Sequence, residues 1–434
     1  MGQDLEINII MPGSEDKHNT KINLKSQKLN TKILSSELLK FKKKKQLKKV
    51  IVKQNYNWNN WKKTKKITPP EATNAPELLT VDHKKYWLFA QLIGDHKNGY
   101  HAWFSDNMKS WSYKGTITTH KSKWVTSVEF LNGEFYIYYD FPNDEDPHLI
   151  IDSNLDDNKI ERNIGKVFDD PSHGSDIAIF RDTDEKFHMI YEDWTPINPR
   201  NHAWDSPLAG HTDSPDGILN FSYNEYIAPI DCRTNPTGRI LNYSPHHTQL
   251  DLNKNLGLYT YEEHEGNMDA FGDFSIIKVG EIYYLFSDYH PKEKNKSMRI
   301  ARWRSNDIYK PFIWDGEIGE DIHPDPSIIF AENMFYLIVQ EGNYDYMSTG
   351  PWLDGVEVRL GLDINNDNDV DYWTKFRKIK ESYSLKKGFT KVIDVIDAEI
   401  SFDSIYLYGF KIEFRLNEKN GCYPEISHLN IILE

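Results

Sequence analysis

The sequence has few cysteines and no long apolar run. Cys232 and Cys422 are the only cysteines in 434 residues and lie far apart, which excludes a disulfide scaffold and a cysteine-built zinc site. No stretch reaches the roughly 18 consecutive apolar residues of a membrane-spanning helix. The first residues lack the basic and apolar regions of a secretory signal. We therefore expect no membrane span, and either a cytoplasmic protein or a periplasmic or secreted one whose leader has been removed.

An excess of basic residues and convincing helical patterns are also missing. The chain carries 52 Lys and Arg against 66 Asp and Glu, a formal charge of −14. An acidic surface repels phosphate backbones, so nucleic acid is not expected as a partner. The exception is a local lysine run at 42–45 and 48–49, which we interpret as a solvated face or a poorly ordered linker. The nearest approach to an amphipathic helix, at 35–49, is weak.

Short aromatic strands, by contrast, are abundant and recur in five units. Each unit starts with an apolar strand and continues with an aromatic one, at 75–79 and 86–89, 127–130 and 135–138, 176–180 and 187–191, 273–277 and 283–286, and 325–329 and 335–338. Third strands follow at 101–106, 148–152, 208–213, 298–303 and 356–361, and fourth strands such as 111–117 and 372–379 complete the units. Four short strands repeated about every fifty residues predict a five-bladed β-propeller.

Both flanks of the repeats are also predicted to form strands. These lie at 5–11, 21–24, 398–402, 410–416 and 426–433. Because neither flank is large enough to fold alone, we expect them to form one small accessory β-sandwich. The predicted fold is all-β, with N-terminal strands and a basic linker in residues 1–60, the propeller in 61–380 and the C-terminal strands in 381–434.

Several phrases resemble the blades of five-bladed glycoside hydrolases of families 43, 32 and 117. They are Ala75-Pro-Glu-Leu-Leu, Trp103-Phe-Ser-Asp-Asn-Met-Lys-Ser-Trp, Lys310-Pro-Phe and Asp325-Pro-Ser-Ile-Ile, and the resemblance covers residues 60–380. It implies an aspartate on the first inner strand, a second carboxylate two blades later and a glutamate acid on the following blade. This chain departs from that pattern, because Ala75-Pro76 stands where the first aspartate is expected. The roles therefore do not transfer directly.

The start of each inner strand opens onto the central funnel, where ligands of such folds bind. Aligning the units places five residues at equivalent positions, namely Ala75, Val125, Asp176, Asp273 and Asp325. Two residues further on, and so on the same face of the strand, are Glu77, Ser127, Ala178, Ser275 and Ser327. Apposed carboxylates raise the pKa of one member, as a general acid requires. The alternative is that each aspartate simply caps a turn.

Read cyclically, Asp176, Asp325 and Glu77 reproduce the order aspartate, aspartate, glutamate of the resembled families. In this reading Asp176 is the base or nucleophile, Asp325 orients and tunes the pKa, and Glu77 donates the proton. Asp273 completes the set of funnel acids.

The third unit is longer than the others and contains an insert at 194–268 that is rich in His, Pro and Gly. A long insert in a compact fold indicates a ligand-shaping loop, and the alternative is a solvated surface loop. The substrate-binding candidates are Trp204, Asp205 and His211 in the insert, together with His290 and His323 beside the blade acids. Aromatic rings could stack on sugars, and histidines could hold a carboxylate or sulfate.

A separate oxygen-rich loop resembles a calcium site. Its candidate ligands alternate along the chain as Asp363, Asn365, Asp367, Asp369 and Asp371. Asn368 stands where such loops usually have glycine, and no glutamate occupies the twelfth position, so a polar hairpin loop is the alternative. The loop would follow the third strand of the fifth blade, and an ion there would be structural.

Together these patterns predict a glycoside hydrolase that cleaves a poly- or oligosaccharide of plant or algal origin with paired carboxylates and without an organic cofactor. One alternative is a non-catalytic carbohydrate-binding propeller, which the missing first aspartate favours. Another is a propeller polysaccharide lyase, which would need a Tyr or His base.

Overall fold

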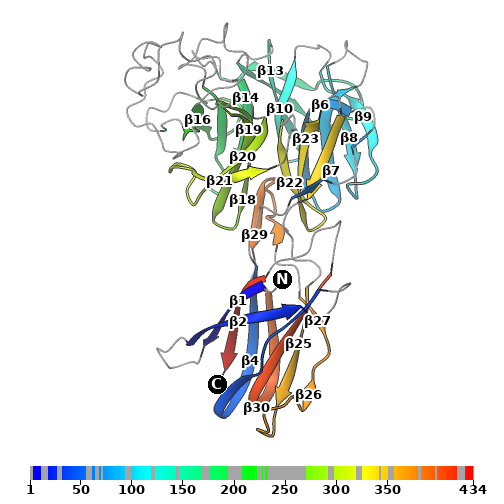
Figure 1. Ribbon diagram of the computed structural model, residues 1–434. Coiled ribbons are helices and arrows are strands. Elements are labelled where there is room, and N and C mark those ends of the chain that lie inside the picture. The colour runs from blue at the N-terminus through cyan, green and yellow to red at the C-terminus, as the bar shows by residue number, and fades with distance from the viewer. Residues whose placement is uncertain are drawn as a thin grey trace. The chain divides into compact units, whose positions relative to one another are not determined.

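The computed structural model shows an all-β chain (Figure 1). It describes residues 3–10, 18–26, 32–54, 61–63, 68–69, 72–92, 99–118, 123–142, 146–168, 175–193, 208–219, 221, 227, 230–232, 270–291, 298–318, 325–341, 344–349, 356–379, 383–395, 398–417 and 426–433. Within these ranges every regular element is a strand, and no helix is present that could cross a membrane.

The strands divide into two compact units. The larger, here called the propeller unit, consists of residues 63–349 and 385–394, and the accessory unit consists of residues 1–62, 350–384 and 395–434. From the repeats, the propeller was predicted to end at residue 380. The structure moves that boundary to 350, because the strands after this point pair within the accessory sheet. Residues 385–394, predicted to belong to the C-terminal strands, are part of the propeller unit.

The first three repeats each form an antiparallel four-stranded sheet. The first sheet contains β6 (Ala72–Asp82), β7 (Lys85–Leu92), β8 (Tyr100–Ser105) and β9 (Ser112–Thr116). The second contains β10 (Trp124–Leu131), β11 (Glu134–Asp140), β12 (Pro147–Asp152) and β13 (Arg162–Lys166). The third contains β14 (Ser175–Arg181), β15 (Phe187–Glu192), β16 (Leu208–Ser214) and β17 (Ile230–Asp231).

The last two sheets recruit strands from distant parts of the chain. The fourth contains β18 (Ala270–Val279), β19 (Ile282–His290), β20 (Arg299–Ser305) and β21 (Ile313–Ile318), and β29 (Val392–Val395) and β28 (Tyr383–Leu385) extend it to six strands beside β18. The fifth contains β22 (Ser327–Ala331), β23 (Met334–Glu341), β24 (Tyr344–Thr349) and β5 (Lys62–Lys63). The N-terminal strand β5 therefore completes the last sheet.

The third and fourth strands predicted for the fifth repeat were wrong. Residues 356–363 form β25 (Val356–Asp363), which pairs with β30 (Ala398–Leu416) along its whole length. The short strands β26 (Tyr372–Trp373) and β27 (Arg377–Lys378) pair with β25. This assignment follows the burial of Val356, Val358, Leu360 and Leu362 in the core of the accessory unit.

The five inner strands lie side by side in a closed ring, β6, β10, β14, β18 and β22, so the sheets are arranged as propeller blades. Serine hydroxyls link neighbouring blades. The backbone N–H of Leu78 donates to Oγ of Ser327, and that of Ile179 donates to Oγ of Ser127. Ser127 and Ser327 come two residues after Val125 and Asp325, the residues predicted to face the funnel. Their hydrogen bonds therefore set the register between adjacent inner strands.

Large side chains fill the space between adjacent sheets. Phe271 and Trp303 pack edge to face, with ring centroids 5.0 Å apart, in a core that also contains Phe180 of the preceding sheet. Tyr136 and Phe187 stack between the second and third sheets. Aromatic side chains from the first, second and third strands of the sheets therefore contribute to the packing between blades.

The accessory unit is one curled nine-stranded sheet. It contains β1 (Gln3–Ile10), β2 (His18–Ser26), β3 (Lys32–Ser35), β4 (Leu39–Gln54), β25, β26, β27, β30 and β31 (Ile426–Leu433). Strand β1 pairs in parallel with β31, and β4 pairs with both β31 and β30. The two flanks of the chain therefore associate in one sheet.

The weak helical pattern at 35–49 and the linker interpretation of the lysine run were both wrong, because Ser35 ends strand β3 and residues 39–49 belong to the 16-residue strand β4. Leu47, Val50 and Val52 of β4 are buried in the core of the accessory unit. Strand β30 pairs with β4 at residues 39–40, 45–47 and 49–52, and β31 pairs with its residues 47–54. This pairing and the burial of these side chains outweigh the low strand preference of lysine.

Candidate active site

The inner strands of the first, third, fourth and fifth sheets share an unusual backbone feature at the funnel position. Asp176 and Asp273 have φ of 46°, Asp325 has φ of 32° and Ala75 has φ of 39°. Non-glycine residues rarely adopt this left-handed conformation, and such residues often mark functional sites. The strand register is irregular around Ala75, Asp176 and Asp273. The equivalence of these residues, predicted from the repeat alignment, is therefore visible in the backbone.

Side chains from the preceding sheet support these left-handed residues. The N–H of Asp176 donates to Oδ2 of Asp140 over 2.9 Å, and the N–H of Ala75 donates to Oε1 of Gln340 over 2.9 Å. Each acceptor residue lies at the end of a second strand, β11 or β23. The same arrangement joins the third and fourth sheets, because the N–H of Asp273 donates to Glu192 at the end of β15.

The aspartates of the fourth and fifth sheets converge. One carboxylate oxygen from each of Asp273, Asp288 and Asp325 lies within 4.8 Å of the others. Asp288, near the end of β19, accepts a hydrogen bond from the N–H of Gly272 over 2.8 Å. His290 Nε2 lies 3.7 Å from Oδ2 of Asp288. The structure therefore brings together two predicted funnel acids and the predicted ligand His290, and it adds Asp288.

Asp273 is the member of this group most suited to hold a proton. Its burial raises the pKa well above the usual range, and the negative charges of Asp176, Asp325, Asp288 and Glu192 raise it further. A neutral carboxyl surrounded by carboxylates is the arrangement that general acid catalysis requires.

Asp140, Glu192 and Asp288 are site residues that sequence reasoning missed. All three are buried, at 0%, 1% and 3% exposure. A signal for them was available, because each one ends or nearly ends an aromatic second strand, as Gln340 does in the fifth repeat. An acid or amide at this repeated position contacts the next blade.

The structure places Glu77 in a different environment from Asp273. Its carboxylate lies 3.6 Å from Nζ of Lys391 and 3.4 Å from the N–H of Val128. Burial raises the pKa of Glu77, and the charge of Lys391 opposes this shift. Lys391 also donates to Oγ of Ser127 and to the carbonyl oxygen of Ile179.

This lysine precedes strand β29, which pairs in parallel with the inner strand β18. Glu129 is the second acid of the group, 4.0 Å from Nζ of Lys391 and hydrogen-bonded by Thr390 Oγ1. We call Glu77, Glu129 and Lys391 the buried charge cluster. Its contacts identify Glu77 as a partner of Lys391, so they give no support to the proton-donor role predicted from the cyclic order.

His211 was predicted to bind substrate as part of the insert, but it lies within strand β16 and is 4% exposed. Its Nε2 lies 3.0 Å from Nδ1 of His188, and its ring stacks on Tyr309 with a centroid distance of 5.7 Å. It is therefore a packed strand residue. Trp204, Asp205 and His323 lie outside the described residues, so their predicted roles remain predictions.

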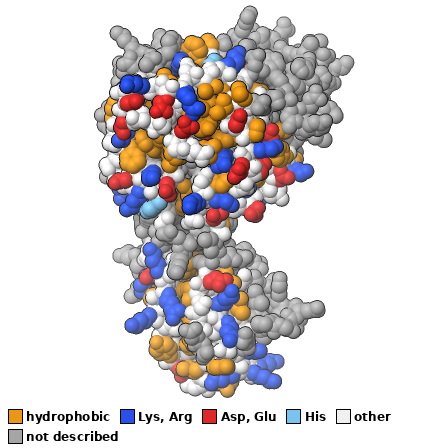
Figure 2. All heavy atoms as spheres, turned by 180° about the vertical axis from the view of Figure 1, so that it is seen from behind, with side chains coloured by type: hydrophobic (Ala, Val, Ile, Leu, Met, Phe, Trp, Pro, Cys, Tyr) orange, Lys and Arg blue, Asp and Glu red, His pale blue; other side chains and the backbone are white. Residues whose placement is uncertain are grey.

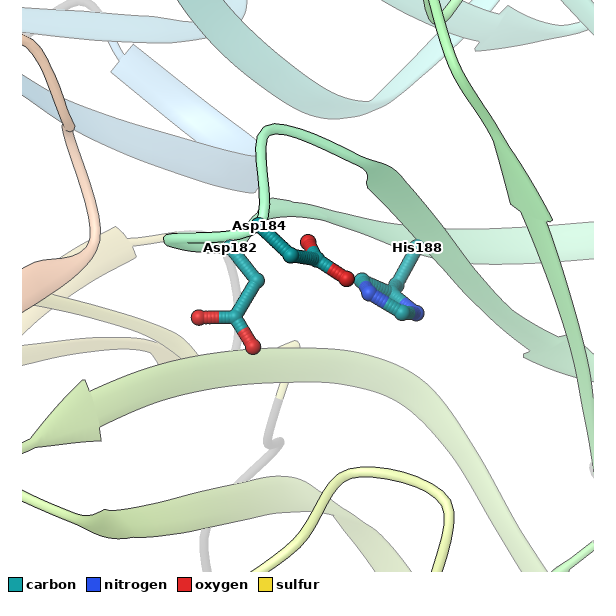
Figure 3. Close-up of side chains that lie close together, drawn as sticks. All are labelled: Asp182, Asp184 and His188. Carbon is teal, nitrogen blue, oxygen red and sulfur yellow. The ribbon is translucent and has the colours of Figure 1, made fainter.

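A second group of titratable side chains, Asp182, Asp184 and His188, lies at the turn between β14 and β15 (Figure 3). The Asp182 carboxylate already accepts hydrogen bonds from Nζ of Lys278, over 2.9 Å, and from the hydroxyl of Tyr283. The positive charge of Lys278 neutralises the negative charge of Asp182, which a metal ion would otherwise need. This group therefore stabilises a turn and does not form a convincing metal site.

The predicted calcium loop lies between β25 and β26 of the accessory unit and not in the fifth blade. Carboxylate oxygens of Asp363, Asp367 and Asp371 lie within 4.8 Å of one another. Asn365 Nδ2 donates to Asp367 and Asp371 over 3.0 and 2.6 Å. Three convergent carboxylates provide the oxygen ligands that Ca²⁺ prefers. The N–H of Val370 donates to Asp369, the remaining candidate, over 2.7 Å.

The comparisons with known proteins give structural likeness alone. No family model and no curated protein matches the chain. Among solved structures, a thermostable family-43 glycoside hydrolase has 14% identity and a TM-score of 0.45, covering 75% of this chain and 99% of that chain. The RS223 β-xylosidase has 14% identity, a TM-score of 0.45 and coverages of 73% and 98%. An endo-arabinase from Bacteroides thetaiotaomicron has 10% identity, a TM-score of 0.43 and coverages of 67% and 98%. These values do not bear on activity or substrate.

Proposed function

We propose that the protein is a glycoside hydrolase that cleaves a poly- or oligosaccharide with paired carboxyl groups at the starts of the inner strands. The observation that carries the proposal is the environment of Asp273, a half-buried carboxyl group that lies close to Asp288 and Asp325 and whose pKa is raised by desolvation and by the charges of Asp176, Asp325 and Asp288. Glycosidic bond hydrolysis needs one carboxylic acid and one carboxylate across the bond.

In the proposed reaction Asp273, and not Glu77 as the cyclic order predicted, is the proton donor. Its protonated carboxyl donates the proton to the departing glycosidic oxygen. Asp176 supplies the carboxylate that activates water or attacks the anomeric carbon, and the charge of Asp325 keeps the pKa of Asp273 high. The hydrogen bonds to the backbones of Asp176 and Asp273 hold both residues in their left-handed conformation without using their own carboxyl groups.

One observation favours a second candidate function, a non-catalytic carbohydrate-binding propeller. Ala75 has the same left-handed backbone and the same type of support as the aspartates, yet it offers no carboxyl group. A propeller that had lost one funnel acid could retain affinity for sugars without cleaving them.

Measuring reducing-end release from a panel of plant and algal glycans, together with equilibrium binding to each glycan, separates the two functions. The hydrolase predicts release from at least one glycan that the protein binds. Binding without release from any glycan would contradict the hydrolase and support the binding module. Release with formation of an unsaturated uronate, detected by its ultraviolet absorbance, would instead indicate a lyase.

A further inference from the structure

The two units carry opposite formal charges. The accessory unit has 22 Lys and Arg against 19 Asp and Glu, a charge of +3, whereas the propeller unit has 30 against 47, a charge of −17. The net charge of −14 is therefore the sum of a basic unit and a strongly acidic one. Such asymmetry indicates that the basic unit has a partner of opposite charge.

Much of the positive charge lies on one strand. Strand β4 contains eight lysines and neither Asp nor Glu in its 16 residues. Lys40, Lys42, Lys43 and Lys44 are exposed, and Lys45 is half-buried. Figure 2 shows that Lys and Arg side chains outnumber Asp and Glu on the visible face of the accessory unit. Strand β30 pairs with β4 at Leu39 and Lys40 and again from Lys45 onward, so Lys42, Lys43 and Lys44 lie in an irregular stretch between two paired parts of the same strand.

The lysines at the start of β4 have few acidic neighbours. Lys49 forms an ion pair with Glu399 over 2.8 Å. In the part of the chain that the structure describes, Lys40, Lys42, Lys43 and Lys45 enter no ion pair. Clustered cations that lack internal counter-charges repel one another, and an anionic ligand would relieve this repulsion.

Two tyrosines of β30 lie beside these lysines. Tyr406 is 51% exposed and pairs in register with Gln46, the residue that follows the run. The ring centroid of Tyr408 is 5.8 Å from Nζ of Lys44. Tyr408 is half-buried. Accessible aromatic rings next to cations provide stacking faces together with charge, which is a suitable combination for a charged sugar polymer.

We propose that the start of β4, with Tyr406 and Tyr408, binds an anionic polysaccharide that carries uronate carboxylates or sulfate groups. We call residues 40–45 with these two tyrosines the basic strand surface. A glycan is favoured over a nucleic acid because every cation of β4 is a lysine. Phosphate recognition in nucleic acids commonly uses the two-pronged guanidinium of arginine. The choice of a glycan also rests on the proposed function of the propeller unit.

Binding of the full chain to polygalacturonate, dextran sulfate, uncharged dextran and a DNA duplex tests this proposal. We expect saturable binding to polygalacturonate, to dextran sulfate or to both, weakening steeply as salt rises, with little binding to dextran. The two charged glycans distinguish carboxylate from sulfate as the recognised group. Tighter binding to DNA than to either charged glycan would overturn the assignment of a glycan ligand.

The variant K42Q/K43Q/K44Q should weaken binding to the charged glycan roughly tenfold or more, because it removes three neighbouring cations. The matched control replaces exposed lysines of the propeller unit, as K109Q/K159Q/K387Q, with the same change in net charge. Equal weakening by both variants would show that only overall charge matters and would overturn the site.

This binding assay is independent of catalysis. If the wild-type protein binds a charged glycan but cleaves no glycan of the panel, the proposed hydrolase is refuted and the binding role of the basic strand surface is still supported. An active hydrolase that binds neither charged glycan would do the reverse.

Discussion

The backbone N–H of Asp273 donates a hydrogen bond to Oε1 of Glu192 over 3.3 Å, across the boundary between the third and fourth sheets. The other oxygen of Glu192 accepts from Oγ of Ser175 over 3.3 Å. Glu192 thus holds the backbone of Asp273 in place, and its charge also raises the pKa of the Asp273 carboxyl. Burial is the main cause of the raised pKa, so Glu192 positions the proposed acid and adds to its proton affinity.

The first prediction concerns this positioning residue. Glu192→Gln keeps an oxygen that can accept from the N–H of Asp273 but removes the negative charge, so the pKa of Asp273 should fall. The alkaline limb of the kcat/KM profile, which reports loss of the Asp273 proton, should shift to lower pH. Glu281→Gln, at an exposed position, is the control and should leave the profile unchanged. An identical alkaline limb in Glu192→Gln and wild type would refute the coupling.

The second prediction is a pH dependence of stability. The folded-state pKa of Asp273 is raised, so the folded protein holds this proton over a range where the unfolded chain releases it. The free energy of unfolding should therefore fall as pH rises from about 4, the ordinary pKa of aspartate, through the raised folded value. Asp273→Asn should reduce this slope in urea titrations across that range. A slope unchanged by the substitution would contradict the raised pKa.

The third prediction separates the buried charge cluster from catalysis. Lys391→Met leaves Glu77 and Glu129 buried without their cation, which should cost about 3 to 5 kcal/mol of unfolding free energy. Glu77→Gln should lower stability less and leave kcat of the folded protein near the wild-type value. Urea denaturation and steady-state kinetics give the two readouts. A loss of kcat of a hundredfold or more in folded Glu77→Gln would restore it as the proton donor.

The fourth prediction concerns calcium. We propose that Asp363, Asp367 and Asp371 bind one structural Ca²⁺, because their oxygens converge. Added Ca²⁺ should raise the Tm of the accessory unit by mass action, and EGTA should reverse the effect. Asp367→Asn should weaken the response, whereas Asp156→Asn, an exposed control in the propeller unit, should preserve it. A Tm independent of Ca²⁺ would identify the loop as a polar hairpin.

The sequence predicted the repeating part of the fold well, because each blade carries its own local signal. Aromatic second strands and apolar first strands recur in every repeat, so the positions of Asp176, Asp273 and Asp325 followed from alignment alone. The last sheet was less predictable, since its fourth strand is β5, from the opposite end of the chain. Residues 356–363 have the same alternating pattern as a blade strand, and only their pairing partner shows that they belong elsewhere.

The site was predictable where the repeat aligned equivalent residues, and not where contacts cross between blades. Asp140 and Glu192 act on the sheet that follows their own, a relationship that spacing along the chain does not show. Glu77 was predicted to face the funnel because it lies two residues after Ala75, on the same face of the strand. A lysine more than 300 residues away in sequence, Lys391, determines its actual environment.

The central claim is that Asp273 is the acid of a glycoside hydrolase, and the rate of reducing-end release from a cleaved glycan tests it most directly. The comparison needs wild type, Asp273→Asn and the exposed control Asp157→Asn, each shown to be folded. We predict that wild type and Asp157→Asn release product at similar rates and that Asp273→Asn is slower by about a hundredfold or more. A folded Asp273→Asn variant with the wild-type rate, or a wild type that cleaves no glycan of the panel, would contradict the account.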